Sequence, residues 1–314
     1  MRKLPRRPWN MPAPSGIVVG MRTVLLLLLL SCTTPPPEPP PPPVDMAGPP
    51  PADAVAARLA ETHARLAQSE AGQQLRRTLD AHGGLEPWLS AGTVTFTFDY
   101  RPLGKPERRM YTRNEVDLWS ARARQIEQGG DASLGWDGEV AWIVPWPEAF
   151  PGDARFWALT PYYFTGMPWV VADPGTRLSL LEPVEVLGQR WTRLKVTYAA
   201  GTGDSPDDYY VLFIDPETDR MGALIYIVSY PGFFEEGQSS PEKFMRYLDH
   251  AEVDGLSVVG RIETLQWDPE TLTPGDKTTD VDVTDVSFGR PWPAALFKAP
   301  PGAYRIPEIE RRSD

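Results

Sequence analysis

The chain has 314 residues, with 31 basic and 42 acidic side chains, a formal net charge of −11 at pH 7 and one cysteine. An acidic surface repels nucleic acid and anionic lipid head groups, so we predict no nucleic-acid partner. A single cysteine cannot form an intramolecular disulfide, so the fold must depend on its hydrophobic core.

The N-terminal region has the pattern of an export signal. Five basic residues and no acidic residue precede position 32, and an apolar run extends from Val24 to Leu30. A basic region followed by a short apolar region is typical of a signal peptide. The run is shorter than the roughly 20 residues that cross a bilayer as a helix. We therefore expect residues 1–31 to be a removable signal, with Met1, Met11 or Met21 as the start.

Leu29-Leu30-Ser31-Cys32 resembles the lipobox of bacterial lipoproteins. The resemblance implies cleavage before Cys32, acylation of this cysteine and attachment to a membrane through its acyl chains. Thr33 in the next position implies, by the same resemblance, an outer-membrane location facing the periplasm. The alternative is a buried cysteine in an ordinary hydrophobic segment. Residues 32–51 are then a lipidated, proline-rich linker, which we expect to extend by about 3.1 Å per residue as polyproline II.

Residues 52–91 are predicted to form an N-terminal helical segment, because helix-favouring residues dominate and apolar positions recur at near-helical spacing. Ser69 is a predicted N-cap of a second helix, and Gly83 and Gly84 end that helix. The three histidines, His63, His82 and His250, are far apart and lack metal-ligand spacing. We interpret His82 as a helix-ending or packed residue and predict no metal site and no cofactor.

Residues 92–307 are dominated by the pattern of antiparallel strands. Thr93–Tyr100 alternates apolar and polar residues, as in a strand with one buried face. Further strands are expected near 108–112 and 115–126. The strands 209–214 and 223–230 are apolar on both faces, so we predict that both faces are covered. A change of phase between Val283 and Val286 predicts a bulge.

Turn sequences divide these strands into hairpins. Asp137-Gly138 and Asp254-Gly255 are favoured two-residue turns, and Gly188-Gln189 is a weaker, glycine-led one. Asp215–Asp219 is a longer turn. Consecutive hairpins predict a meander. About nine to eleven strands are too many for a flat sheet, so we expect the sheet to curl.

An aromatic-rich insert, 147–172, interrupts the strand pattern. We predict two short helices there, with Thr160 as an N-cap and Pro161 at the first helical position, covering the concave face. Its large side chains are candidates for lining a hydrophobic ligand site, and they serve equally well as core residues. The candidates are Phe156, Trp157, Tyr162, Tyr163, Phe164, Met167 and Trp169.

Three segments resemble the LolA-like superfamily of lipoprotein carriers and related anchored envelope lipoproteins. They are Trp136–Trp142, Arg193–Thr197 and Tyr209–Asp219. The resemblance implies an α+β fold, in which a curved antiparallel β-sheet forms an open half-barrel. An N-terminal helix and short helices would cover its concave face, and the cleft would bind a lipid or a lipoprotein acyl chain.

The sequence contains no nucleophile elbow, phosphate loop or dinucleotide fingerprint. We therefore favour a monomeric, membrane-anchored, non-enzymatic lipoprotein that binds a hydrophobic ligand and assign no catalytic residue. One alternative is a structural or interaction lipoprotein whose core fills its own cleft. Another is a hydrolase, because the sequence does not show which carboxylates meet in space. Residues 308–314 are predicted to be a charged tail.

Overall fold

The computed structural model describes residues 45–199, 205 and 207–306. The predicted signal, Cys32, most of the linker and the charged tail lie outside the described residues. The chain divides after Pro43 into two units, and the description below concerns the second. Within the described ranges, each helix is too short or too polar to cross a bilayer.

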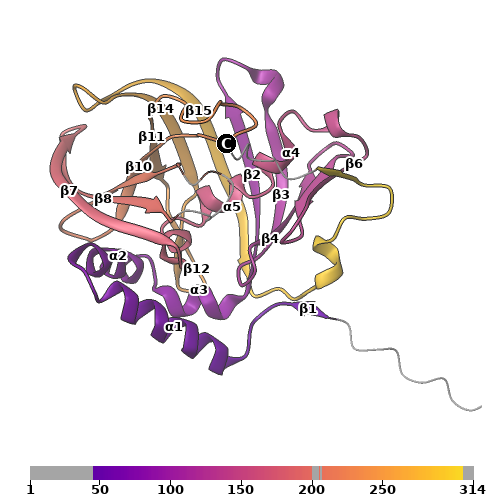
Figure 1. The fold of residues 1–314 in the computed structure, drawn as a ribbon, viewed down its shortest axis with the longest axis horizontal. Coiled ribbons are helices and arrows are strands. Elements are labelled where there is room, and N and C mark those ends of the chain that lie inside the picture. The colour runs from indigo at the N-terminus through magenta and orange to yellow at the C-terminus, as the bar shows by residue number, and fades with distance from the viewer. Residues whose placement is uncertain (1–44, 200–204, 206, 307–314) are drawn as a thin grey trace, which may run out of the picture. The chain divides into compact units, whose positions relative to one another are not determined.

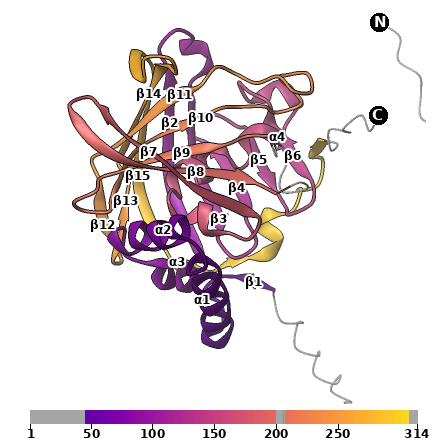
Figure 2. The same cartoon turned by 60° about the vertical axis from the view of Figure 1, so that its left-hand side comes forward.

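Three helices open the second unit, and they lie together at one end of the sheet (Figures 1 and 2). They are α1 (Ala52–Leu66), α2 (Glu70–Ala81) and α3 (Leu85–Ala91). Ser69 caps α2 as predicted, because its hydroxyl accepts a hydrogen bond from the Gly72 N–H at 3.0 Å. The apolar faces of α1 and α2 bury Val55, Leu75 and Leu79 in the main core.

The sheet has 13 strands in the order β17-β6-β5-β4-β3-β2-β15-β14-β11-β10-β9-β8-β7. All neighbours are antiparallel, and the edge strands β17 and β7 do not pair with each other. An open, curved antiparallel sheet with helices at one end confirms the predicted α+β half-barrel (Figure 2). The strands are β2 (Thr93–Pro102), β3 (Met110–Asp117), β4 (Arg122–Glu127), β5 (Ser133–Trp136), β6 (Ala141–Val144), β7 (Thr176–Val186), β8 (Gln189–Tyr198), β9 (Tyr210–Ile214), β10 (Met221–Tyr226), β11 (Lys243–Leu248), β14 (Arg261–Asp268), β15 (Thr273–Phe288) and β17 (Tyr304–Ile306).

The strand order departs from the predicted meander where strands distant in the chain pair and where the consecutive strands β6 and β7 lie apart. Strand β2 pairs with β15, so the first and last long strands lie side by side in the middle of the sheet. The Asp254-Gly255 turn is confirmed, because Val253 pairs with Leu256 across it. It closes a ribbon of β12 (Ala251–Val253) and β13 (Leu256–Val258), which lies in the connection between the paired strands β11 and β14. A second short pair joins β1 (Met46–Ala47) to β16 (Trp292–Pro293).

The predicted strand at 115–126 is wrong, because a turn separates β3 from β4. The Asp117 carboxylate accepts hydrogen bonds from the Trp119 N–H at 2.9 Å and the Ser120 hydroxyl at 2.6 Å, and Ala121 has a φ of 53°. A side chain that hydrogen-bonds to residues two or three positions later in the chain stabilises a turn relative to an extended strand. The predicted bulge is confirmed, since the β15 register shifts between Thr284 and Ser287.

The sheet is buried on both faces over β9 and β10, as their sequences predicted. The main core covers the concave face and includes Phe96, Phe98 and Leu224. A second cluster contains Phe213, Phe244 and Trp267, and the latter two rings stack at 5.2 Å.

His82 connects α2 to the sheet. Its side chain is 1% exposed, and its Nε2 atom accepts a hydrogen bond from the Met221 N–H at 3.1 Å. A proton on Nδ1 faces the Ser257 carbonyl at 3.5 Å. Burial, followed by the charges of His250 and Arg220, lowers the pKa of His82 to about 4. The residue ends its helix and is packed, as predicted.

We expect the free energy of unfolding to fall as pH drops from about 6.5 to about 4. Unfolded His82 takes up a proton at its ordinary pKa of 6.5, whereas the folded ring stays neutral until about pH 4. At roughly 1.4 kcal/mol per pKa unit, the loss reaches about 3 kcal/mol. His82→Gln keeps an acceptor and removes the charge, so urea denaturation should show a shallower pH dependence. The control His63→Gln should leave the slope unchanged. Equal slopes for His82→Gln and the parent protein would contradict the assignment.

Candidate functional site

The connection between β6 and β7 crosses the sheet. These strands lie near opposite ends of the strand order, so the intervening residues must pass over a face of the sheet. The connection contains η2 (Pro147–Ala149), α4 (Ala154–Trp157), α5 (Thr160–Thr165) and η3 (Trp169–Ala172). Its buried residues belong to the main core on the concave face (Figure 1). The prediction of short helices on that face is confirmed.

Helix α5 starts one residue earlier than predicted, so Pro161 is its second residue and not its first. Thr160 is the first residue of α5 and Leu159 precedes it as the N-cap, so the assignment of Thr160 as a cap is wrong. The Thr160 hydroxyl donates backwards to the Phe156 carbonyl at 2.6 Å, which ties α5 to α4. A side-chain N-cap is found instead at the start of α4, where the Asp153 carboxylate accepts a hydrogen bond from the Phe156 N–H at 2.8 Å.

Polar side chains from distant elements hold the connection in place. The Gln125 amide on β4 donates to the carbonyls of Trp157 and Ala158, the latter at 3.2 Å. The Tyr247 hydroxyl on β11 donates to the Phe164 carbonyl at 3.0 Å. These carbonyls lie at the ends of short helices, where the backbone lacks intrahelical partners. Side chains of the sheet therefore cap the short helices of this connection, residues 145–175, which we call the crossing segment.

The structure divides the predicted site residues into two groups. The first packs against α3: Trp169 stacks on Trp88 at 4.8 Å, Tyr162 stacks on the same ring at 6.4 Å, and Met167 is 3% exposed. The second group borders cavities: Phe156, Trp157, Tyr163 and Phe164. The crossing segment thus fills part of the concave face and leaves space beside itself.

The larger cavity has a volume of about 920 Å³ and lies at the end of β2 away from α1–α3. The crossing segment forms one wall, with Phe150, Trp157 and Phe164. The opposite walls come from β2, β3, β10, β11, β14 and β15 and the loops beside them. Their apolar and aromatic contributors are Tyr100, Leu103, Met110, Tyr226, Val228, Phe233 and Phe234.

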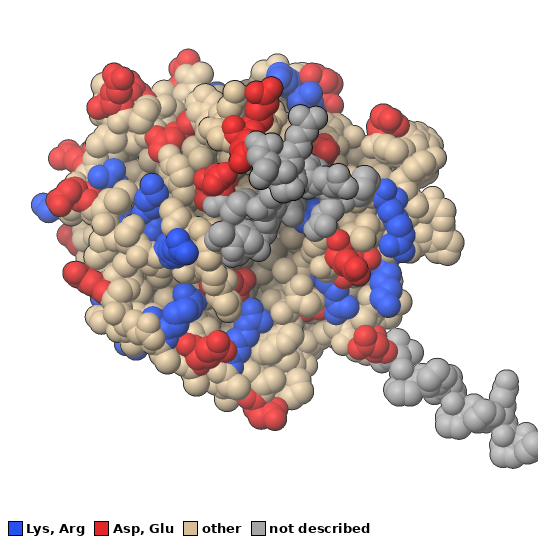
Figure 3. Space-filling view, in the orientation of Figure 1, with Lys and Arg blue, Asp and Glu red and all other residues tan. Residues whose placement is uncertain are grey.

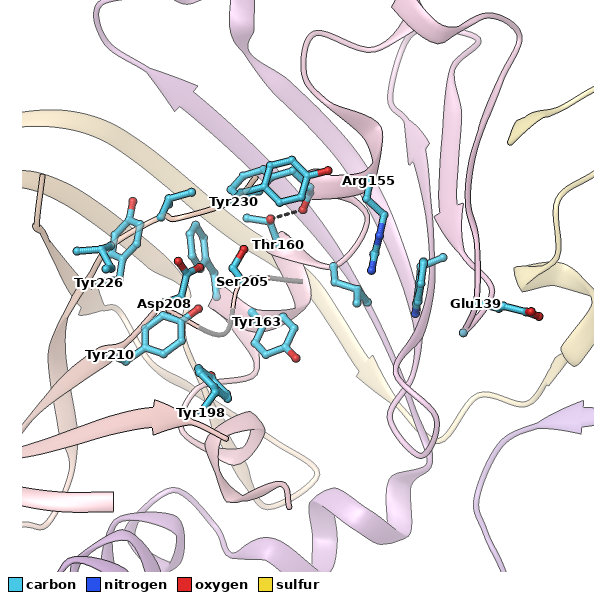
Figure 4. Close-up of a pocket in the computed structure, with 17 residues that line it drawn as sticks. Glu139, Arg155, Thr160, Tyr163, Tyr198, Ser205, Asp208, Tyr210, Tyr226 and Tyr230 are labelled. Atoms are coloured by element: carbon cyan, nitrogen blue, oxygen red, sulfur yellow. Dashed lines mark hydrogen bonds between the residues drawn. The ribbon is translucent and has the colours of Figure 1, made fainter. Parts of the chain in front are cut away.

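A smaller cavity of about 540 Å³ lies on the other side of the crossing segment. It is rich in tyrosines, and Figure 4 shows Tyr163, Tyr198 and Tyr210 grouped near Asp208. The Asp208 carboxylate accepts from the Ser229 hydroxyl at 2.7 Å, and burial raises its pKa in spite of that hydrogen bond. Sequence analysis did not single out Asp208, and its position just before the buried strand β9 is the signal that could have found it.

The two cavities share a wall. Both are lined by Phe156, Thr160, Phe164, Tyr226 and Val228. Volumes of about 300–1,000 Å³ are typical of small-molecule sites, and both cavities fall in that range. No group of three or more metal-ligating side chains occurs among the described residues.

Comparison with known proteins found similarity only at the level of the fold. No family model matches the chain, and no curated protein sequence matches it. Solved structures with similar folds include a LolA superfamily protein from Nitrosomonas europaea, at 11% identity and a TM-score of 0.46. That match covers 73% of this chain and 97% of the other.

Two further structures are similar to this chain at the same low level of identity. A DUF1329 family protein from Desulfovibrio piger has 11% identity and a TM-score of 0.45, covering 78% of this chain and 97% of the other. The lipoprotein LppX from Mycobacterium tuberculosis has 13% identity and a TM-score of 0.24, with coverages of 75% and 96%. The solved structures with similar folds thus include a LolA superfamily protein, as the sequence resemblance implied.

Gln125→Leu should destabilise the protein by about 1–3 kcal/mol, because it leaves the carbonyls of Trp157 and Ala158 without their donor. Chemical denaturation measures this difference. The control Gln128→Leu changes an exposed residue of the same type, whose amide bonds only to the Ile126 carbonyl. Equal stabilities for the two variants would show that the amide does not hold the crossing segment.

Proposed function

We propose that this protein is a lipoprotein of the cell envelope that binds a lipid or an acyl chain in the larger cavity. The observation that carries the proposal is a 920 Å³ space beside the crossing segment, walled by aromatic and aliphatic side chains. Removing apolar surface from water is sufficient to hold such a ligand, and no chemistry is required. The protein then acts as a binder or carrier.

The arrangement of the cavity suits a long apolar ligand. Its inner wall contains the buried residues Met110, Phe150 and Trp157, whereas Leu103 and Phe233 at its border are 50% and 49% exposed. Exposed apolar side chains beside a cavity are more typical of a ligand-binding site than of a closed core. Each methylene buried there contributes about 0.8 kcal/mol, which offsets the cost of immobilising a flexible chain.

The envelope location and the membrane anchor are supported by the sequence pattern at Val24–Cys32. An acylated Cys32 followed by a proline-rich linker would hold the folded unit near a membrane while leaving its cavity free. Because residues 1–31 hold five basic and no acidic residues, their removal makes the chain still more acidic. Acyl chains, and not a basic surface, would then provide the attachment.

Narrowing the cavity tests the binding proposal. Delipidated protein should bind one oleate, detected by native mass spectrometry and by titration. Val228→Trp adds bulk at the wall shared by both cavities, so it should weaken binding at least tenfold. Val184→Trp, a half-buried position beside the second cluster, is the matched control and should bind as the parent does. Failure of the parent protein to bind oleate or any other amphiphile with the same tail would refute the proposed function.

Replacing the cysteine tests the anchor separately. In a bacterial host, Cys32→Ala should leave the precursor uncleaved and should abolish incorporation of labelled palmitate. Cell fractionation and labelling measure both effects. Normal processing of the variant would exclude a lipoprotein signal, and the binding proposal would be unaffected.

A further inference from the structure

Basic side chains gather at one border of the larger cavity. Lys105 and Arg108 lie on the exposed connection between β2 and β3, and Lys243 is the first residue of β11 and is half-buried. Lys277 on β15 also lines the cavity, where it pairs with Asp280 at 2.9 Å and Glu263 at 3.6 Å. One connection and two strands therefore bring four cations to one place.

Three of these cations have no acidic partner within the described ranges. Neither Lys105, Arg108 nor Lys243 forms an ion pair with another described residue. Acidic and basic side chains are mixed over the face drawn in Figure 3.

Lys243 is held in an unfavourable setting. Burial lowers its pKa, and the charge of Lys105 lowers it further. A half-buried ammonium group beside a second cation loses hydration and gains repulsion. An anion placed between them would reverse both effects.

The carboxylates at the cavity do not supply that anion. Asp153 is already engaged, because it caps α4 and accepts from the Tyr230 hydroxyl at 3.2 Å. Glu148 and Asp276 line the cavity and are exposed to solvent. Among the described residues, no carboxylate forms an ion pair with Lys105 or Lys243, so both cations are available to an anionic ligand.

The cations lie at the border of the cavity, and the apolar wall lies deeper inside it. Lys105 and Arg108 are exposed, whereas Met110, Phe150 and Trp157 are buried. A ligand that matches both parts has an apolar tail directed inward and a charged head directed outward. Arginine and lysine donate charge-assisted hydrogen bonds to carboxylate or phosphate oxygens.

We propose that the larger cavity binds an amphiphile with an anionic head group, held at the border by Lys105, Arg108 and Lys243. The proposal rests on the function proposed above and specifies its ligand class. A fatty-acid carboxylate and a lysophospholipid phosphate share the required chemistry. Neutral amphiphiles with the same tail lack it.

The test compares ligands with one tail and different heads. Titrations of the parent protein use oleate, oleoyl lysophosphatidic acid, oleyl alcohol and inorganic phosphate. One or both anionic amphiphiles should bind about tenfold or more tightly than oleyl alcohol, and inorganic phosphate should not compete. The preference should decrease as salt is added, because exposed charges are screened.

Variants then assign the preference to the border cations. Lys105→Gln combined with Lys243→Gln should weaken binding of the anions about tenfold and leave oleyl alcohol unchanged. The control Lys298→Gln removes an exposed cation that does not line the cavity, so it should have no effect. Thermal unfolding of the double variant confirms that a loss of binding is not a loss of folding.

The outcomes separate this inference from the proposed function. Equal binding of oleate, lysophosphatidic acid and oleyl alcohol would overturn the head-group assignment and retain the hydrophobic site. Competition by inorganic phosphate at the affinity of lysophosphatidic acid would also overturn it, because the tail would contribute nothing. Failure of every amphiphile to bind would refute the proposed function itself.

Discussion

One topological constraint governs the concave face: β6 and β7 are consecutive in the chain and lie near opposite ends of the sheet. The residues between them must therefore travel across the sheet. A backbone that crosses an apolar surface needs partners for its N–H and C=O groups, and short helices satisfy most of them internally. The remaining carbonyls are met by Gln125 and Tyr247, which project from β4 and β11. The crossing segment is thus a consequence of strand order.

The same constraint produces the cavities. A narrow helical segment cannot cover a face formed by a 13-stranded curved sheet. Trp169 and Tyr162 fill the region near α3 by stacking on Trp88, and the spaces beside α4 and α5 remain open. Core packing at one end of the segment fixes the position of the cavity walls at the other. Binding sites are often built in this way, on a scaffold that rigid packing elsewhere has already placed.

Local sequence patterns predicted local structure well here. The Asp254-Gly255 turn, the Ser69 cap and the bulge in β15 each depend on residues close together in the chain. The β2–β15 pairing and the division of the aromatic residues between core and cavity depend on contacts far apart in sequence. Tyr162 and Tyr163 are adjacent and chemically identical, yet the former stacks on Trp88 and the latter borders a cavity. No periodicity within one short helix distinguishes them without the position of the sheet.

The cluster of cations at the cavity border could not be predicted from the sequence for the same reason. Lys105 and Lys243 are far apart in the sequence, and neither belongs to a recognisable basic motif. Only the arrangement of β2, β3 and β11 places them at one cavity. The overall composition is acidic, and it does not reveal a local cluster of basic side chains.

The crossing segment contributes side chains to both cavities and no strand to the sheet. Its residues can therefore be exchanged, lengthened or shortened without altering the register of any strand pair. In evolutionary terms, the scaffold and the ligand wall are separable: mutations in α4 and α5 reshape the wall, while the ladder hydrogen bonds that stabilise the half-barrel are retained. A protein built in this way can acquire a new ligand without first acquiring a new fold.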